Sequence, residues 1–119
     1  MLRTIYLSLL IIVAAGCEKM SDPVKVTYRV SRAYSSVEVT WRDSENDLQA
    51  QTIPFESIQD LWQKSLTMQP GQIVYLSAIY ADSASSANVQ VLMNGKVYKE
   101  AFSSNEPDKY IIVSGVIPY

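Results

Sequence analysis

The sequence contains no histidine, one cysteine and only four glycines among its 119 residues. Without histidine it lacks the side chain that most often carries protons near neutral pH, which is also the commonest metal ligand. The single cysteine, Cys17, has no second cysteine in the chain with which to form a disulfide. No glycine-rich loop of the phosphate-binding kind occurs. We therefore expect no metal site and no cofactor.

Charge is scarce and evenly spread. The chain has 10 basic and 12 acidic residues, a formal net charge of −2. The basic residues are scattered singly and form no stripe, which argues against nucleic-acid binding. Serines are plentiful, but no local motif places a base beside one, and no pair of carboxylates stands out. These patterns predict a protein that is not an enzyme.

Three acidic residues alternate in a way that superficially resembles a calcium loop: Asp43, Glu45 and Asp47. An EF-hand loop beginning at Asp43 requires glycine at its sixth position and glutamate at its twelfth. Those positions hold Leu48 and Pro54. We predict a hairpin turn here, because Asp and Asn side chains favour turns by bonding their own backbone.

The N-terminal segment has the pattern of a secretory signal peptide. Arg3 supplies one positive charge, the stretch 5–15 is almost wholly apolar, and the small residue Gly16 precedes Cys17. A helix needs about 20 residues to cross a bilayer, so a transmembrane anchor is disfavoured. We predict residues 1–16 to be a signal peptide.

The residues "VAAGC" that end at Cys17 resemble the lipobox of bacterial lipoproteins, in which cleavage occurs before a lipid-modified cysteine. The resemblance implies that Cys17 is the lipid attachment point and that residues 17–23 are a tether. It also implies a membrane-anchored location in the bacterial cell envelope, periplasmic or surface-exposed. Ala14 departs from the leucine that is commoner at its position in the family. The alternative is an ordinary signal peptide with an incidental cysteine.

From residue 24 onward the hydrophobic pattern has a period of two. The stretches "VKVTYRVS" and "VEVTWRD" alternate apolar and polar residues, which predicts two antiparallel strands with one wet face. The stretch "QIVYLSAIYA" is apolar on both faces, as expected for a central strand buried on both sides. Asn94-Gly95, between two alternating runs, predicts a two-residue type I′ hairpin.

The segment 55–68 fits two structures. Phe55, Ile58, Leu61, Trp62 and Leu66 fall at helical spacing, which favours an amphipathic helix. As a strand, Trp62 and Leu66 share a face with Met68, although Lys64 interrupts it. The surrounding all-β pattern favours the strand.

Seven or eight short strands about a dozen residues apart predict one all-β domain over residues 24–119. The expected architecture is an antiparallel β-sandwich of the immunoglobulin-like type. Trp41 is a candidate for the centre of its core, because a large aromatic side chain buries more area than any other residue.

Tyrosine is abundant, with eight in the chain. Tyr80, Tyr98 and Tyr110 are candidates for a sugar- or protein-binding surface, since amphipathic rings are common at such sites. The alternative is that the rings flank the core and only their hydroxyl groups meet water.

The domain also resembles the soluble domain of the MmpS-type proteins, membrane-anchored β-sandwich accessories of RND-family exporters. The matching stretches, in order, are "VTYRV", "VEVTW", "IVYLSAIYA", "NGKVYKE" and "IIVSG". The resemblance implies an accessory role without catalytic residues, although that family uses a transmembrane helix where this chain has a lipobox. We expect a protein that binds an envelope partner in a transport assembly. The alternatives are a glycan- or lipid-binding module and a purely structural envelope protein.

Overall fold

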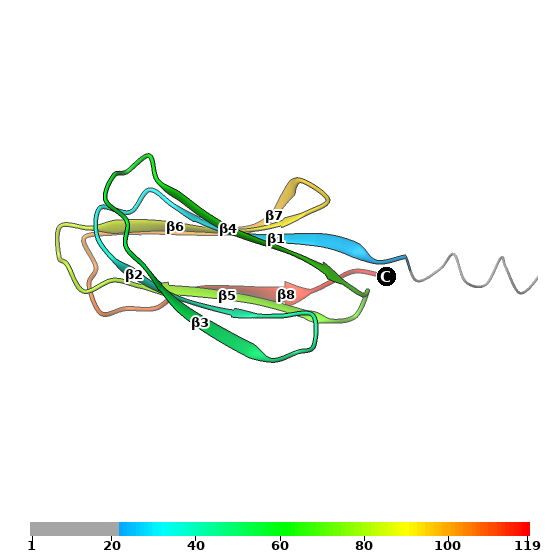
Figure 1. The fold of residues 1–119 in the computed structure, drawn as a ribbon. Coiled ribbons are helices and arrows are strands. Elements are labelled where there is room, and N and C mark those ends of the chain that lie inside the picture. Colours follow the sequence, from blue (N-terminus) through cyan, green and yellow to red (C-terminus); the bar gives the residue numbers. More distant parts are fainter. Residues whose placement is uncertain (1–21) are drawn as a thin grey trace, which may run out of the picture.

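The computed structural model describes residues 22–119, which form two four-stranded antiparallel sheets packed face to face (Figure 1). The predicted β-sandwich is therefore confirmed. The predicted signal peptide and all but the last two residues of the tether 17–23 lie outside the described residues. The strands are β1 (Val24–Ser31), β2 (Val37–Arg42), β3 (Leu48–Ile53), β4 (Leu61–Met68), β5 (Ile73–Ile79), β6 (Ser86–Met93), β7 (Lys96–Ser104) and β8 (Ile111–Val116).

The first sheet, called sheet A here, has the strand order β4-β1-β6-β7, and sheet B has the order β3-β2-β5-β8. The chain crosses between the sheets after β1, and again after β3, β4, β5 and β7. β1 and β2 both lie in the interior of their sheets, whereas the first strand of an antibody domain lies at an edge. The start of β1 and the C-terminus lie at the same end of the sandwich (Figure 1).

The core consists of the alternate residues that each strand directs between the sheets. In β1 these are Val26, Tyr28 and Val30, all fully buried. In β2 they are Val37, Val39 and Trp41, which are also buried, so Trp41 belongs to the core. Each such apolar side chain contributes roughly 1.5–3 kcal/mol on burial. The period of two in the sequence thus defines the interior.

Tyr28 and Tyr80 are the largest fully buried side chains within residues 22–119, and the Tyr28 hydroxyl group links the two sheets. The hydroxyl donates a hydrogen bond to the Arg42 carbonyl at 2.7 Å and accepts one from the Tyr75 amide at 3.4 Å. Arg42 ends β2 and Tyr75 lies in β5, so one side chain of sheet A contacts both central strands of sheet B. Burial raises the pKa of Tyr28 to about 12.

The ambiguous segment 55–68 is a loop followed by a strand, not a helix. β4 pairs with β1 along its whole length, from Leu61 opposite Ser31 to Met68 opposite Val24. Eight consecutive pairs satisfy the backbone ladder, which outweighs the local helical spacing. Residues 55–60 form the connection, in which the Asp60 carboxylate accepts hydrogen bonds from the amides of Glu56 and Ser57.

Two predicted turns are confirmed. Asn94 and Gly95 have φ values of 50° and 84°, as a type I′ hairpin requires. The Asn94 side chain also accepts a hydrogen bond from the Lys25 amide at 3.1 Å, which fastens the turn to β1. In the acidic turn, the Asp43 carboxylate accepts hydrogen bonds from the amides of Glu45 and Asp47. The bonds from Asp47 and from the Gln49 side chain lower the pKa of Asp43.

The stretch predicted to be buried on both sides, "QIVYLSAIYA", is fully buried on one side and only partly buried on the other. β5 is central in sheet B, between β2 and β8, but no layer of the described chain covers its outer face. Val74, Leu76 and Ala78 point into the core, whereas Ile73 is 43% exposed. The prediction of a doubly covered strand is therefore wrong.

We predict that replacing Tyr28 with phenylalanine lowers the free energy of unfolding by about 1–2 kcal/mol, because the partly buried Arg42 carbonyl loses its donor. Urea denaturation of both proteins at neutral pH measures the difference. Equal unfolding midpoints would show that the hydroxyl contributes nothing to stability.

The same pair of proteins gives a prediction for alkaline pH. The unfolded chain releases the Tyr28 proton near pH 10 and the folded chain only near 12, so the contribution of this group is complete below pH 10 and is lost above it. The stability difference between wild type and Tyr28→Phe should shrink across that interval. A difference that stays constant from pH 9 to pH 12 would contradict the raised pKa.

Candidate functional site

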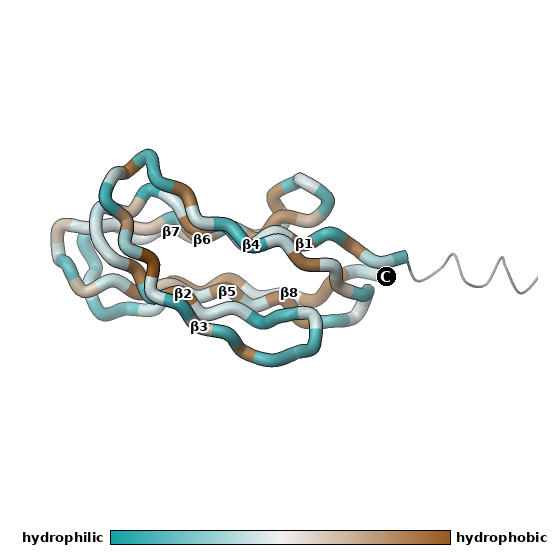
Figure 2. Tube along the Cα trace, in the orientation of Figure 1, coloured by the Kyte–Doolittle hydropathy of each residue, from teal (hydrophilic) through white to brown (hydrophobic). Residues whose placement is uncertain are grey.

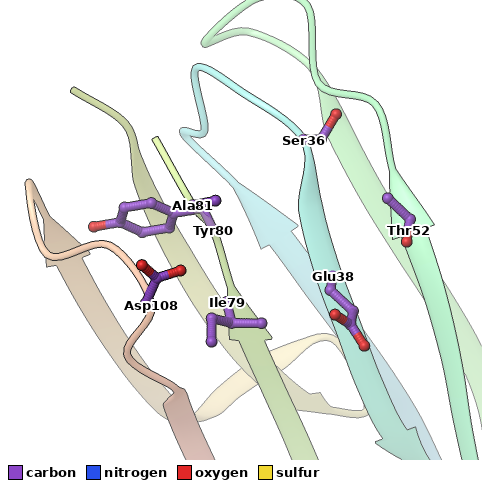
Figure 3. A pocket seen from close by; sticks show the side chains of 7 residues that line it. All are labelled: Ser36, Glu38, Thr52, Ile79, Tyr80, Ala81 and Asp108. Carbon is purple, nitrogen blue, oxygen red and sulfur yellow. The ribbon is translucent and has the colours of Figure 1, made fainter. Parts of the chain in front are cut away.

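A shallow depression lies at the end of the sandwich opposite the start of β1. It is lined by Ser36, Glu38, Thr52, Ile79, Tyr80, Ala81 and Asp108 (Figure 3). Its volume is about 240 Å³, below the roughly 300–1,000 Å³ of typical small-molecule sites, and it is open to solvent. In Figure 3 the Ile79 side chain lies between the carboxylates of Asp108 and Glu38. The lining contains no basic residue and no nucleophile paired with a base.

Tyr80, a candidate for a binding surface, is instead part of the interior. Its side chain is 2% exposed. Its hydroxyl group accepts a hydrogen bond from the Glu106 amide at 3.0 Å and lies 3.3 Å from the Ser103 hydroxyl. Its carbonyl accepts a further bond from the Asp108 amide. The Tyr80 ring therefore fixes the loop between β7 and β8 and offers little exposed surface, although the residue borders the depression.

The other two tyrosine candidates lie far apart along β8. Tyr98 is half-buried beside the end of β8, where its hydroxyl donates to the Val116 carbonyl at 3.1 Å. A Cβ atom on Gly115 would lie 3.0 Å from the Tyr98 ring, so this glycine makes room for it. Tyr110 immediately precedes β8 and is 65% exposed. The three candidate tyrosines do not form one surface.

The candidate surface that the structure does show is the outer face of sheet B over β5 and β8. The register places Ile73 opposite Val116 and Ser77 opposite Ile112 on this face. Ile112 is 50% exposed and Val116 53% exposed. Tyr75 and Ile79 continue the same face along β5 and are half-buried. We call the set Ile73, Tyr75, Ile79, Tyr110, Ile112 and Val116 the apolar strip, and Figure 2 shows the hydrophobic character of β5 and β8.

The outer face of sheet A is different in character. Its cross-strand neighbours are mostly polar and bond to one another: Thr27 to Ser65 at 3.1 Å, and Arg29 to Gln63 at 3.3 Å. Gln90 donates to Glu100 on the same face. Three exposed apolar residues are exceptions on this face: Leu61, Val97 and Phe102. One face of the sandwich is thus mostly polar and hydrogen-bonded, with apolar residues on its two edge strands, and the other carries the apolar strip.

The sequence analysis missed the apolar strip, although its signal was present. The stretches that form β5 and β8 are apolar at both odd and even positions, which shows that two faces need cover without showing what covers the second. Within residues 22–119 no further layer covers the second face of either strand, although Ser77 on the second face of β5 is buried.

The structure also bears on metal-binding, serine-nucleophile, membrane-spanning and lipid-attachment sites. Across residues 22–119, no three potential ligands among Cys, Asp and Glu gather closely enough to hold a metal ion. The hydroxyl groups of Ser85 and Ser86 bond to backbone groups of the chain. No helix long and apolar enough to cross a membrane occurs in this part of the protein. The predicted lipid attachment point, Cys17, lies outside the described residues.

Comparison with models of known protein families gives no match, and comparison with curated proteins gives none either.

We predict that Tyr80→Phe lowers the free energy of unfolding by about 1–2 kcal/mol, because the Glu106 amide loses its acceptor. Tyr110→Phe is the matched control, since the Tyr110 ring is exposed; it should change stability by less than about 0.5 kcal/mol. Thermal or urea unfolding measures both. Equal effects of the two changes would contradict the structural role of Tyr80.

Proposed function

We propose that this protein is a non-enzymatic, membrane-anchored lipoprotein that binds another protein of the bacterial cell envelope. The observation that carries the proposal is the apolar strip, because exposed apolar side chains gathered on one face of a folded domain mark sites of protein interaction. The lipobox-like sequence ending at Cys17 supports the anchor. Acyl chains on that thiol would contribute about 0.8 kcal/mol per buried methylene group, and two or three chains hold firmly.

The anchor would set the orientation of the sandwich. A tether over residues 17–23 leads directly into β1, whose first residue lies at the same end as the C-terminus (Figure 1). That end would face the membrane. The apolar strip runs along the side of the sandwich, from Ile73 and Val116 near that end to Ile112 further along β8. A partner embedded in or close to the same membrane could therefore reach it.

The resemblance to the MmpS-type accessories supports a transport assembly as the setting of the partner. Those proteins combine a membrane anchor with a β-sandwich and have no catalytic residues, as we propose here. The alternative of a glycan- or lipid-binding module is less favoured, since Tyr80 is buried and the depression beside it is shallow.

We predict that Cys17→Ser moves the protein from the membrane fraction to the soluble envelope fraction, because the acylated thiol is lost. Mass spectrometry of the wild-type protein should find its N-terminus at Cys17 with acyl chains attached. A secreted wild-type protein with a free thiol would overturn the anchor.

We predict that Ile112→Lys abolishes recovery of a stoichiometric partner in affinity purification from detergent extracts. A lysine placed at the centre of the apolar strip cannot be buried without desolvating its charge. Phe102→Lys is the matched control, since Phe102 is 57% exposed but lies on the outer face of sheet A; this variant should keep the partner. Loss of the partner from both variants, or from neither, would contradict the assignment of the strip.

A further inference from the structure

β8 combines the apolar strip with an open backbone edge. Within residues 22–119 it pairs with β5 on one side and with no strand on the other. Just beyond β8, both backbone groups of Ile117 bond toward β5: its amide to Gln72 and its carbonyl to the Gly71 amide. Because consecutive residues of an antiparallel strand direct these groups to opposite sides, Ile112, Ser114 and Val116 direct theirs away from β5.

One of these outward-directed backbone groups, the Val116 carbonyl, has a hydrogen-bond partner within the domain. The backbone groups of Ile112 and Ser114 remain available to another strand. The Val116 carbonyl accepts the hydrogen bond from the Tyr98 hydroxyl. Ile112 and Ser114 make no such contact with a side chain of β7. Both are exposed, so the part of β8 that precedes Gly115 offers the N–H and C=O groups of an unpaired strand.

The edges of sheet A carry features that oppose pairing with another strand. β4 has Lys64 on its inward-facing side, and inward-pointing charges are a known protection of edge strands. β7 carries Lys96, Lys99 and Glu100, together with a bulge at Tyr98 where the register to β6 shifts. β8 contains no charge, no proline and no bulge. The β8 edge is therefore unprotected, whereas the β4 and β7 edges of the same molecule are protected.

The remaining edge, β3, is also uncharged, but Leu48 is the one strongly exposed apolar residue in it and lies opposite Arg42. Its sequence is "LQAQTI", and the register places its Ala50 and Thr52 opposite Thr40 and Glu38 of β2. A strand added there would gain backbone hydrogen bonds and little apolar contact. A strand added to β8 would gain both, because Ile112 and Val116 lie on the adjacent outer face.

We propose that the partner contributes an extended segment that adds to sheet B as a fifth strand along β8. This inference rests on the proposed function and names how that partner binds. On the outer face the segment would place apolar residues at alternate positions beside Ile112 and Val116. Its other side chains would face β7, where the Lys99 side chain lies next to Gly115, so polar or acidic residues suit them.

A second copy of the chain fits less well than a partner segment. Two β8 strands paired antiparallel would turn the copies end for end, so that the starts of their β1 strands lie at opposite ends of the pair (Figure 1). Two short tethers could not then hold both copies upright on one membrane.

The test uses a substitution that removes an edge hydrogen bond without touching the β5 pairing. The Ser114 amide points to the open side, so Ser114→Pro deletes that donor and leaves the bonds to β5 in place. Ser114→Ala keeps the amide and is the matched control. The probe is a library of random peptides displayed on phage and selected on the full-length protein in detergent.

The selected peptides should lack proline and alternate apolar with polar residues. Ser114→Pro should weaken their binding by about tenfold or more, and Ser114→Ala by less than about twofold. Single N-methylation of a selected peptide gives a readout that does not depend on the stability of the variant. Methylation at every second residue of the peptide should abolish binding, because those amides donate to β8. Methylation at the residues between them should be tolerated. Failure to select any peptide, or equal binding to the proline variant, would overturn the inference.

Affinity purification with the two kinds of variant separates this inference from the proposed function. Loss of the native partner from both Ile112→Lys and Ser114→Pro supports strand addition. Loss of the native partner from Ile112→Lys alone overturns strand addition, and a partner that covers only the outer face of sheet B is then left. Retention by both overturns the proposed function as well. Concentration-dependent dimers of wild type that Ser114→Pro abolishes would replace the partner segment with a second copy.

Discussion

The burial of two valine-rich sheet faces against each other is the constraint on which the rest of this structure depends. The chain has one cysteine, so no internal disulfide supports the sandwich, and its stability must come from this interior. Every second residue of the interior strands is committed to it. The Tyr28 hydroxyl is satisfied inside by sheet B, which lets a large polar side chain occupy the centre without an unpaired group. Since the inner faces are fixed by folding, the outer faces and edges are where the two sheets can differ.

The outer faces and edges of the two sheets differ in the same direction. Sheet A has a polar outer face with cross-strand hydrogen bonds, and its two edges carry lysines or a bulge. Sheet B has the apolar strip and an uncharged edge at β8. Protection of edges is general in soluble β-proteins because an open edge is a template for pairing. A molecule that protects one sheet and leaves the other open therefore distinguishes a side that must stay solvated from a side that can be covered.

The sequence was sufficient for features set by local pattern and insufficient for those set by distant parts of the chain. Alternation in β1 and β2 identified their inner residues, and Asn94-Gly95 identified its hairpin, because strand period and turn chemistry are local. Alternation cannot show whether a face is covered, which is why the exposed side of β5 was misjudged. The burial of Tyr80 was not predicted because its bonding partners, Ser103 and Glu106, come from more than 20 residues further along the chain. The segment 55–68 was ambiguous for the same reason, since the strand is decided by its pairing with β1.

The combination of an apolar face and an open edge also bears on the proposed anchor. In a freely diffusing protein such a surface is a hazard, because copies that meet in any orientation can pair edge to edge. A lipid anchor with a short tether would restrict each copy to one orientation relative to the membrane. Antiparallel pairing of β8 strands needs opposite orientations, so anchoring would disfavour it while leaving β8 open to a segment presented by a neighbouring envelope protein. A lipid anchor at Cys17 would therefore do more than place the protein, because it would keep the open edge of β8 available to a partner.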